Sequence, residues 1–312
     1  MTQGSSRAVT CFAPATVANV AVGFDVLGFS FDTLGDHVEV ERTETSGVFL
    51  ESVTGVADCP ADGTQNTATV ALASMVTALD LPFGFRIRLT KGIPLGSGMG
   101  GSAASAVGAV VAANALLDEP RALAELYDWA LDGEAVASGA RHADNVAPCL
   151  YGGLVAALPD THVVSIPVPE GLVCVLARPD IRLDTKAQRG VLANQVPLGQ
   201  YVEQSARLAA FVSACFSGDL DLLRTSMRDV IVEPQRAPAI PEIHAVRQAV
   251  QGAGALACAI AGSGPSIFAW AEERDAEAVR AAASAAYAAA GLAHDVWVAR
   301  VGGPGAHVLE GT

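Results

Sequence analysis

The feature that most constrains the fold of this chain is a run of four glycines within six residues, from Gly96 to Gly101. The run ends the segment KGIPLGSGMGG over residues 91–101, and a stretch rich in Ser, Ala and Val follows it directly over residues 102–117. Before it, apolar and polar residues alternate over 85–90, which is typical of a half-buried strand. The sequence therefore predicts a strand, a glycine loop and a helix in that order.

Three unrelated kinds of nucleotide site use the spacing G-x-G-x-x-G that Gly96, Gly98 and Gly101 satisfy. A dinucleotide-binding fold requires an acidic residue about 20 residues further on, at the end of a second strand. Here Asp118 and Glu119 lie at the end of a predicted helix instead. The Gly-Lys-Ser/Thr of a Walker loop and the His-Arg-Asp and Asp-Phe-Gly signatures of protein kinases do not occur in the sequence.

The remaining interpretation of the loop is phosphate binding by the backbone. Glycines let backbone N–H groups approach a phosphate closely, and the N-terminus of the next helix adds unpaired N–H donors and the positive end of its dipole. The structural alternative is a tight turn between strand and helix. Because such a turn needs one or two glycines rather than four, phosphate binding is the favoured hypothesis.

The charge of the chain limits the partners that it can bind. Lys and Arg number 19 against 33 Asp and Glu, and the net charge of -14 argues against a general nucleic-acid or anionic-membrane binder. Acidic residues are missing from Leu81 to Leu117, a window that contains Arg86, Arg88 and Lys91. Such a window either faces an anion or is a buried strand and helix, and Arg86 and Arg88 are interpreted as the solvated face of that strand.

Glu134 occupies an unusual position on the second predicted helix. With about 100° of rotation per residue, Glu125, Asp128 and Asp132 share one face, whereas Glu134 falls among apolar residues on the other side. A carboxylate on an apolar face is costly unless a cation or hydrogen-bond donors meet it. Mg²⁺ is a suitable partner because it takes one or two carboxylates together with phosphate oxygens. A partly exposed helix end is the alternative.

Helix and strand patterns are mixed in both halves of the chain, which predicts a two-domain α+β fold. The Pro-rich stretch 159–169 is the expected boundary and gives domains 1–160 and 161–312. Strands are predicted at 8–12, 37–42, 48–52, 85–90, 154–158, 163–166, 173–177, 255–261, 267–270 and 295–301, and helices at 66–79, 102–117, 121–138, 186–192, 201–216, 220–227, 241–251 and 275–290.

No segment of the sequence indicates export or membrane insertion. Residues 1–10 contain one Arg and no apolar core of a signal peptide. The most apolar stretch, 103–117, is interrupted by Ser105 and Asn114 and is too short to span a bilayer. The six cysteines show no Cys-x-x-Cys spacing and are expected to be reduced thiols. The sequence therefore predicts a cytoplasmic protein.

Three segments stand in order along the chain: PATVANVAVGFDVLG over 14–28, PLGSGMGGSAAS over 94–105 and GSGPS over 262–266. Together they resemble the three motifs of the GHMP small-molecule kinases, named for galactokinase, homoserine kinase, mevalonate kinase and phosphomevalonate kinase. The resemblance extends from about residue 9 to residue 270. Further patterns resemble the homoserine-phosphorylating branch: Asn19 with Gly23-Phe24-Asp25, GARHADNVAP over 139–148, Thr185 with Arg189, and EPQR over 233–236.

The resemblance implies a fold and a reaction. The N-terminal domain would be of the ribosomal-protein-S5-like type and the C-terminal domain ferredoxin-like. The enzyme would transfer the γ-phosphoryl group of ATP, with Mg²⁺, to the side-chain hydroxyl of L-homoserine on the route to threonine. Its partners would be these two small molecules, and homodimers are common among such kinases.

The resemblance also implies roles for individual residues. Ser102 and Glu134 would hold Mg²⁺, and with Thr185 and Arg189 they form the predicted catalytic set. The predicted ATP contacts are Asn66, near the adenine, and Pro94, Leu95, Gly96, Ser97, Gly98, Met99, Gly100, Gly101, Ser102 and Ser105. The predicted substrate contacts are Asn19, Asp25, His142, Asn145, Arg189, Arg236, Gly262 and Gly264. Where the family loop commonly reads Gly-Ser-Ser-Ala-Ala, this chain has Gly101 and lacks that first hydroxyl.

The chemistry of an amino-acid substrate agrees with these residues. A zwitterion needs an anion such as Asp25 for its ammonium group, and the forked guanidinium of Arg189 or Arg236 matches its carboxylate. Mevalonate has no ammonium group, and a sugar would need neither arginine. Two alternatives stay open, namely a GHMP kinase for another small hydroxylated substrate and a ligand-binding relative without activity. No side chain is identified as the catalytic base.

Overall fold

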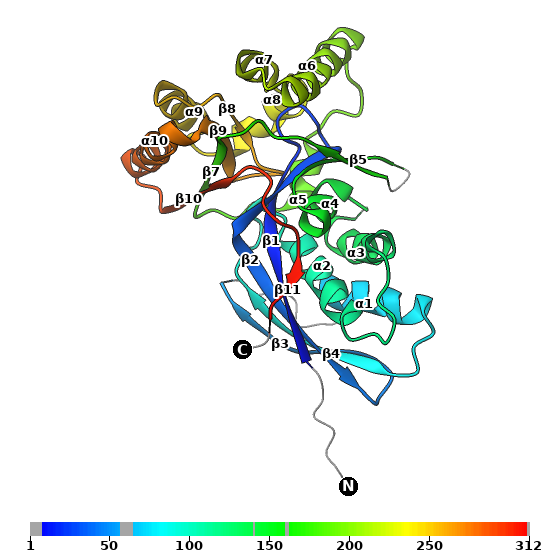
Figure 1. The fold of residues 1–312 in the computed structure, drawn as a ribbon. Helices are drawn as coiled ribbons and strands as arrows, with labels where there is room; N and C mark the ends of the chain where they lie inside the picture. Colours follow the sequence, from blue (N-terminus) through cyan, green and yellow to red (C-terminus); the bar gives the residue numbers. More distant parts are fainter. Residues whose placement is uncertain (1–7, 57–64, 140, 160–161, 311–312) are drawn as a thin grey trace.

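The computed structural model describes residues 8–56, 65–139, 141–159 and 162–310, which form two lobes, each built on one β-sheet (Figure 1). In the first sheet the strand order is β11-β1-β2-β4-β3, and β5 and β6 extend it from β2. All of its neighbouring strands are antiparallel except β3 and β4. These strands are β1 (Ala8–Ala18), β2 (Leu27–Thr43), β3 (Gly47–Gly55), β4 (Gly84–Lys91), β5 (Leu154–Ala157), β6 (Val163–Ile166) and β11 (His307–Val308).

The strands β1 and β2 are longer than the sequence predicts. Their expected parts, 8–12 and 37–42, are half-buried and alternate in polarity, whereas 13–18 and 27–31 are buried on both faces. An alternation pattern detects only half-buried strands, so the fully buried continuations were missed. These continuations carry the two strands from the first lobe to the second (Figure 1).

Four helices cover one face of the first sheet: α1 (Thr67–Ala78), α2 (Gly101–Asn114), α3 (Leu123–Ser138) and α4 (Ala143–Tyr151). The predicted helix start at Asn66 is confirmed, because its side chain caps α1 by accepting from the amides of Ala68 and Thr69. The helices predicted over 102–117 and 121–138 are confirmed within a few residues. The helix α4 was not predicted, since it is short and contains Pro148.

The opposite face of the first sheet is charged. Arg86 and Arg88 of β4 are half-exposed there and form ion pairs with Glu41 of β2. Arg88 also pairs with Glu39 and with Glu51 of β3. The interpretation of these two arginines as the solvated face of a strand is confirmed, and their cross-strand partners leave them engaged within the sheet.

The second lobe contains an antiparallel sheet in the order β10-β7-β9-β8, made of β7 (Leu172–Pro179), β8 (Ala257–Ile260), β9 (Ile267–Glu272) and β10 (His294–Arg300). The helices α9 (Ile243–Gly252) and α10 (Ala276–Ala289) pack against it. Strand and helix order together give the ferredoxin-like arrangement. The remaining helices of this lobe are α5 (Thr185–Gly190), α6 (Leu198–Ser217), α7 (Leu220–Ser226) and α8 (Glu233–Arg236), with short 3₁₀ turns at Ala237–Ala239 and Glu273–Asp275.

The two lobes share one apolar core. Phe29 of β2 contacts Phe268 and Trp270 of β9, and Trp270 also contacts Phe211 of α6. The side chains of all four residues are fully buried. The first sheet also contains β6 and β11, which lie beyond the expected boundary at residues 160 and 161. Strands from both sides of that boundary therefore belong to the first sheet.

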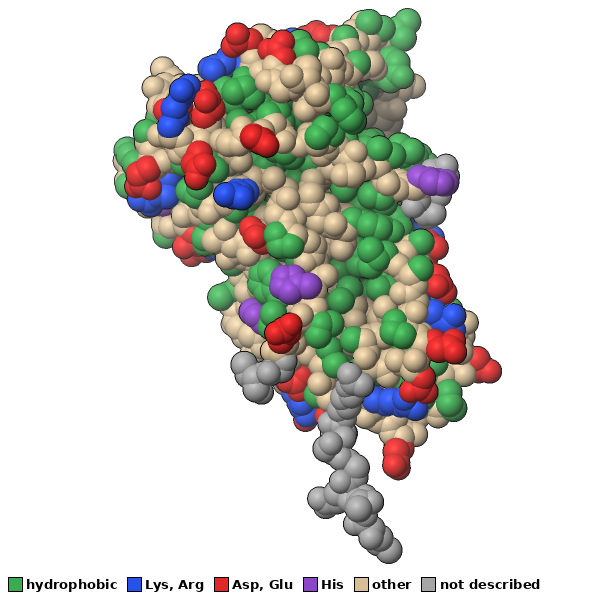
Figure 2. Space-filling model, in the orientation of Figure 1, with side chains coloured by type: hydrophobic (Ala, Val, Ile, Leu, Met, Phe, Trp, Pro, Cys, Tyr) green, Lys and Arg blue, Asp and Glu red, His purple; other side chains and the backbone are tan. Residues whose placement is uncertain are grey.

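The molecular surface carries charges of both signs. On the face shown in Figure 2, acidic and basic side chains are interspersed, so the net negative charge does not gather there in one patch. None of the helices in the described part of the chain combines the length and the apolar character needed to cross a membrane.

Candidate active site

A cavity of about 320 Å³ lies between the two lobes, and we refer to it as the interlobe cavity. Its wall combines the glycine loop, α3 and α4 of the first lobe with α5, α8 and the turn after β8 of the second. Most residues predicted for a site line it: Asn19, Asp25, Pro94, Leu95, Gly96, Ser97, Gly98, Met99, Gly100, Gly101, Ser102, Glu134, His142, Asn145, Thr185, Arg189, Arg236 and Gly262.

The glycine loop is anchored to the rest of the protein through its carbonyl groups rather than through its N–H groups. The carbonyl oxygens of Gly96, Ser97 and Met99 accept hydrogen bonds from the backbone amides of Leu183, Ser266 and Thr16 respectively. Within the described residues, the amides of 96–100 donate no hydrogen bond in return. The loop therefore uses its acceptors for its own anchoring and leaves its donors for a ligand, which is the arrangement that an anion needs.

The start of α2 continues this surface. The N-cap residue Gly100 has a left-handed backbone, and no side chain caps the helix. The first turn of α2 contains no acidic residue, so the helix carries no carboxylate of its own that would neutralise the positive end of its dipole. The unpaired amides of this turn extend the row of donors formed by the loop.

The loop requires glycine for packing as well as for ligand approach. Gly98 has a φ of 78°, and a Cβ atom there would lie 2.4 Å from the carbonyl oxygen of Ala261. A Cβ atom on Gly100, whose φ is 68°, would lie 2.0 Å from the hydroxyl oxygen of Thr16. The glycines thus let the loop pack directly on the turn of the second lobe and on β1.

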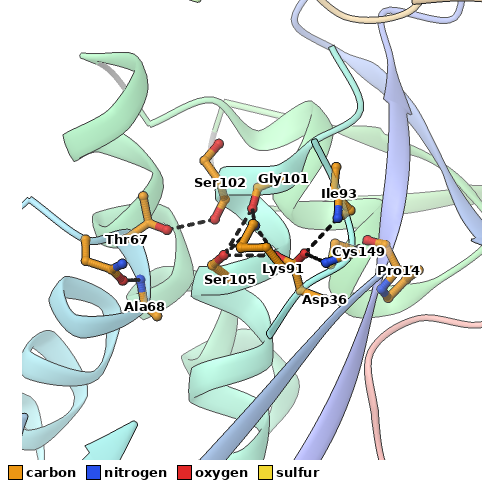
Figure 3. Close-up of polar contacts among 12 residues, drawn as sticks. Pro14, Asp36, Thr67, Ala68, Lys91, Ile93, Gly101, Ser102, Ser105 and Cys149 are labelled. Carbon is orange, nitrogen blue, oxygen red and sulfur yellow. Dashed lines mark hydrogen bonds and ion pairs between the residues drawn. The ribbon is translucent and has the colours of Figure 1, made fainter. Parts of the chain in front are cut away.

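A buried ion pair supports the loop from below (Figure 3). The ammonium group of Lys91 contacts the carboxylate of Asp36 and also donates to the carbonyl oxygen of Gly101 at 2.7 Å and to the hydroxyl of Ser105 at 2.9 Å. The same carboxylate accepts from the backbone amides of residues 92 and 93 at 3.0 and 3.2 Å. Asp36 therefore anchors residues 92 and 93 at the strand end of the loop, and Lys91 anchors Gly101 at its helix end.

Ser102 and Glu134 face the same cavity from two helices. Ser102 lies in the first turn of α2, and Glu134 lies in α3 with only 5% of its surface exposed. The alternative of a partly exposed helix end is therefore wrong for Glu134, whose neighbours Tyr127 and Ala130 are also buried. A buried carboxylate opposite a hydroxyl at the edge of an anion site has the donor set of a divalent cation that also binds phosphate oxygens.

A tight turn after β1 presents Asn19 to the cavity. Asn19, Val20 and Ala21 all have left-handed backbones, which is costly for residues other than glycine. The side chain of Asn19 donates to the carbonyl oxygen of Gly262 at 2.9 Å and accepts from the amide of Asp25 at 3.1 Å. Asn19 thus ties the turn of the second lobe to the loop that carries Asp25.

Two of the predicted substrate residues pair with each other. The Nη2 atom of Arg189 donates to both carboxylate oxygens of Asp25, at 2.7 and 2.9 Å. Arg236 is almost fully buried and donates to the carbonyl oxygen of Gly262 at 2.9 Å. Burial, followed by the neighbouring Arg189, lowers the pKa of Arg236. Asp25, Arg189 and Arg236 therefore bring one carboxylate and two guanidinium groups to the same cavity.

The start of α4 adds three polar side chains to the cavity. His142 is the N-cap residue, yet its side chain makes no capping bond. Burial, with a smaller effect of Arg189, lowers the pKa of His142. Asn145 accepts from the hydroxyl of Thr16 at 2.8 Å. Asp144 is buried, and this burial, together with the charges of Asp25 and Glu134, raises its pKa to about 7.

Three predicted residues do not line the cavity. Asn66 is buried as the cap of α1, Ser105 is buried in the Asp36–Lys91 network, and Gly264 lies behind the loop next to Ile240. Their contacts with ATP or substrate stay predictions. Ser105 instead supports the loop, because its hydroxyl lies 3.0 Å from Asp36 and 3.1 Å from the carbonyl oxygen of Gly101.

The cavity is also lined by charged residues to which the sequence pattern assigns no role. Arg182, Asp184 and Lys186 line the cavity and flank the predicted Thr185. Asp144 lies inside the quoted motif 139–148 but received no role. The window without acidic residues is also not free of them in space, because carboxylates from distant segments lie under the loop and opposite it. They are those of Asp25, Asp36, Glu134, Asp144 and Asp184.

Comparison with known families gives two matches along the chain. The GHMP kinases N terminal domain matches residues 66–153, and the GHMP kinases C terminal domain matches residues 211–289. The first range contains the glycine loop and Glu134, and the second contains α8 with Arg236 and the turn at Gly262.

Individual relatives match over nearly the full length. The chain is 47% identical to the homoserine kinase of Xylella fastidiosa (strain 9a5c) over 310 residues, which cover 99% of this chain and 96% of that protein. It is 39% identical to the homoserine kinase of Chlorobaculum tepidum over 322 residues, covering 98% and 99%. The crystal structure of homoserine kinase from Cytophaga hutchinsonii superposes with a TM-score of 0.94 at 40% identity and covers 99% of both chains.

The Asp36–Lys91 pair gives a first prediction. Asp36→Asn or Lys91→Met leaves one buried charge without its partner and lowers the free energy of unfolding by about 3–5 kcal/mol. The double variant loses clearly less free energy of unfolding than the two single variants together, because neither charge remains buried. Urea denaturation of the four proteins measures this cycle. The half-exposed pair Arg86 and Glu41 is the control, with an effect of about 1 kcal/mol or less. Additive losses at Asp36 and Lys91 would contradict the assignment.

The raised pKa of Asp144 gives a second prediction. Folding favours the protonated carboxyl, so the stability that this group contributes is present at acidic pH and is lost as the pH rises from about 4 through about 7. Asp144→Asn removes this dependence. The melting temperature of the variant minus that of the parent therefore becomes larger as the pH rises from 5 to 8. The exposed Asp118→Asn is the control for a lost charge. An Asp144 difference that is equal at both pH values would overturn this prediction.

Proposed function

Because the chain belongs to the homoserine kinases of the GHMP kinase family, we propose that it transfers the γ-phosphoryl group of ATP, with Mg²⁺, to the side-chain hydroxyl of L-homoserine. The product would be O-phospho-L-homoserine, an intermediate on the route to threonine. Since both substrates are metabolites of the cytoplasm, the proposal assigns the enzyme to that compartment. The homodimer that the resemblance implies stays a prediction.

One observation carries this proposal: the interlobe cavity joins a row of free backbone donors to a cluster of one carboxylate and two guanidinium groups. The donors suit the phosphates of a nucleotide, and the charged cluster suits an amino acid. Since both line one cavity, a phosphate group and an amino-acid hydroxyl can be held next to each other.

The chain would bind the phosphates mainly with its backbone. The amides of 96–100 and the first turn of α2 offer donors, and Arg182, which packs against Gly96, and Lys186 add positive charge to the same cavity. Because the Asp36–Lys91 network fixes both ends of the loop, these donors are already in place before the ligand arrives. Such preorganised donors stabilise developing charge without a reorganisation cost at the moment of transfer.

The residues that would hold Mg²⁺ are Ser102 and Glu134. Glu134 is buried and lines the interlobe cavity, as does Ser102 at the start of α2, so a carboxylate and a hydroxyl are both available in the cavity that contains the proposed phosphate loop. Within the described residues no three His, Cys, Asp or Glu side chains form a metal cluster, so the remaining ligands would be phosphate oxygens and water. When bound, Mg²⁺ neutralises the charge that develops on the transferred phosphoryl group.

Substrate recognition would proceed by exchange of partners. In the structure Asp25 and Arg189 form an ion pair, so each charge is neutralised by the other. A zwitterion can replace this pair, because its ammonium group takes Asp25 and its carboxylate takes Arg189 and Arg236. A ligand with only a carboxylate would leave Asp25 unpaired, and a sugar would gain from neither group. The pair therefore favours amino acids over the substrates of other GHMP kinases.

The phosphoryl transfer itself would be direct. The chain positions the two reactants and neutralises charge, which is most of what phosphoryl transfer requires of a protein. No phosphorylated side chain is part of the proposal. Trapping a phosphoenzyme during turnover would contradict the direct transfer.

The test of the proposed substrate is an ADP-release assay with a panel of L-homoserine, mevalonate and galactose. We expect turnover with L-homoserine alone, and product identification by mass spectrometry as O-phospho-L-homoserine. Turnover with mevalonate or galactose but not L-homoserine would favour another branch of the family. Nucleotide binding without turnover on any of the three would favour a relative that has lost its activity.

The proposed metal ligand gives a third prediction. Glu134→Gln keeps the shape but removes the charge, so we expect kcat to fall by about 100-fold or more and MgATP binding to weaken. Glu125→Gln, in the first turn of the same helix, is the matched control and leaves kcat near the parent value. Steady-state kinetics and calorimetry with MgATP measure both effects. Near-normal kinetics of the Glu134 variant would remove this residue from the metal site.

The proposed carboxylate contact gives a fourth prediction. Arg189→Met removes the guanidinium group that pairs with Asp25, so we expect the KM for L-homoserine to rise by about tenfold or more and that for ATP to change by about twofold or less. The exposed Arg121→Met controls for the loss of one positive charge. An equal rise of both KM values would count against a role in substrate recognition.

A further inference from the structure

A second cavity, of about 620 Å³, lies entirely within the second lobe, and we refer to it as the arginine cavity. It is lined by residues of α6, α7, α8, α9 and β8 and of the segments that follow α7 and precede β8, and it shares no lining residue with the interlobe cavity. The helix α8 separates the two: Arg236 lines the interlobe cavity, whereas Glu233 and Pro234 line the arginine cavity. No step of the proposed phosphoryl transfer uses this second cavity.

The arginine cavity gathers positive charge in an acidic protein. Arg207, Arg224, Arg228 and Arg247 line it together with His244, while its acidic residues are Asp229 and Glu233. The chain as a whole has 19 basic and 33 acidic residues. A local excess of cations against this background needs a physical reason, because like charges that share a cavity repel one another.

The two carboxylates of the arginine cavity are committed to the protein. Asp229 accepts from the backbone amides of residues 231, 232 and 233 at 2.8 to 2.9 Å. Glu233 pairs with Arg247 and accepts from the amide of Ile260 at 2.9 Å. These carboxylates build the start of α8 and its link to β8, so they have little capacity left for further cations.

Two arginines remain without such partners. Arg207 is bonded to Glu203 and to the carbonyl oxygen of Thr225. The side chains of Arg224 and Arg228, in contrast, form no hydrogen bond or ion pair within the described part of the chain, and the same holds for the side chain of His244. Guanidinium forks that face a concave surface without a protein acceptor are suited to carboxylate or phosphate oxygens.

The floor of the arginine cavity is apolar. Met227 and Leu256 are buried there, and Ala257 and Ala259 of β8 complete it. An inorganic ion alone would leave this floor uncovered, whereas a small molecule with a carbon frame and an anionic group meets both surfaces.

We propose that the arginine cavity binds a small organic anion, a phosphate ester or a carboxylic acid, through Arg224 and Arg228. Its occupancy reaches the interlobe cavity through α8, because Glu233 joins Arg247 to Ile260, and Ile260 leads to the turn at Gly262 that holds Arg236. An anion that competes with Glu233 for Arg247 loosens α8 and hence the position of Arg236. This link to substrate binding rests on the proposed function, whereas the binding of the anion does not.

Calorimetric titration of the full chain tests the binding, with glycerol 3-phosphate and succinate as probes in a phosphate-free buffer of low ionic strength. We expect at least one probe to bind, and Arg224→Gln/Arg228→Gln to weaken that binding by about tenfold or more. Arg274→Gln/Arg280→Gln, with the same charge change on α10 and the turn before it, leaves the affinity within about twofold. Thermal unfolding of both double variants verifies that they fold.

The outcomes distinguish two classes of ligand, and two of them would contradict the proposal. Binding of glycerol 3-phosphate alone identifies phosphate esters as the ligand class, and binding of succinate alone identifies carboxylic acids. Absence of binding by both probes, or equal affinities in the parent and in Arg224→Gln/Arg228→Gln, would overturn the proposed site.

The link to the interlobe cavity has its own measurement. At a saturating concentration of the bound probe, we expect the KM for L-homoserine to rise by about fivefold in the parent and to stay constant in Arg224→Gln/Arg228→Gln. A KM that does not respond in the parent would contradict the link through Glu233. If L-homoserine is not phosphorylated at all, the proposed function fails while the calorimetric result still decides the anion site.

Discussion

The buried contact between Asp36 and Lys91 is the interaction on which the site depends. The two residues lie 55 positions apart and leave water completely, with exposures of 0% and 1%. Burial of two charges is costly unless their other hydrogen-bonding groups are satisfied. Here those groups are satisfied by the two ends of the glycine loop, so the pair can be stable only when the loop is in place. This coupling turns an intrinsically flexible glycine segment into a fixed row of amide donors.

The second constraint is the common core of the two lobes. Phe29 at the base of β2 packs on Phe268 and Trp270 of β9, which places the turn at Gly262 against the glycine loop. Because Gly98 touches the backbone of that turn directly, a small shift between the lobes would close or distort the interlobe cavity. The packing of large rings far from the chemistry thus determines the distance between the phosphate loop and the charged cluster.

The interlobe cavity and the arginine cavity differ in which of their charged side chains are already paired within the protein. In the interlobe cavity, Asp25 and Arg189 cancel each other, and the cavity can accept a molecule that carries both signs. In the arginine cavity the carboxylates are bonded to the protein, and two arginines are left over. The same residue types would therefore suit a zwitterion in the first cavity and, as proposed, an anion in the second, because different charged groups are already paired within the protein in each cavity.

Local pattern determined much of this protein. Helices with clear apolar periodicity, the half-buried strands and the cap at Asn66 were predictable, since each depends on neighbours within a few residues. The glycine loop and the unusual face of Glu134 also indicated a phosphate and metal site from the sequence alone. Burial of Glu134 is confirmed by the structure, and its role as a metal ligand stays a prediction.

Only the tertiary structure decided what surrounds these residues. The window without acidic residues was interpreted as a segment that faces an anion or is buried, and the fold brings the carboxylates of Asp36 and Asp144 from other segments under the loop and into the cavity. Ser105, whose contact with ATP stays a prediction, lies in the Asp36–Lys91 network that supports the loop. Linear spacing reports helix faces and strand alternation, whereas the partner of a buried charge is set by which distant segments the core packs together, and that information is not local.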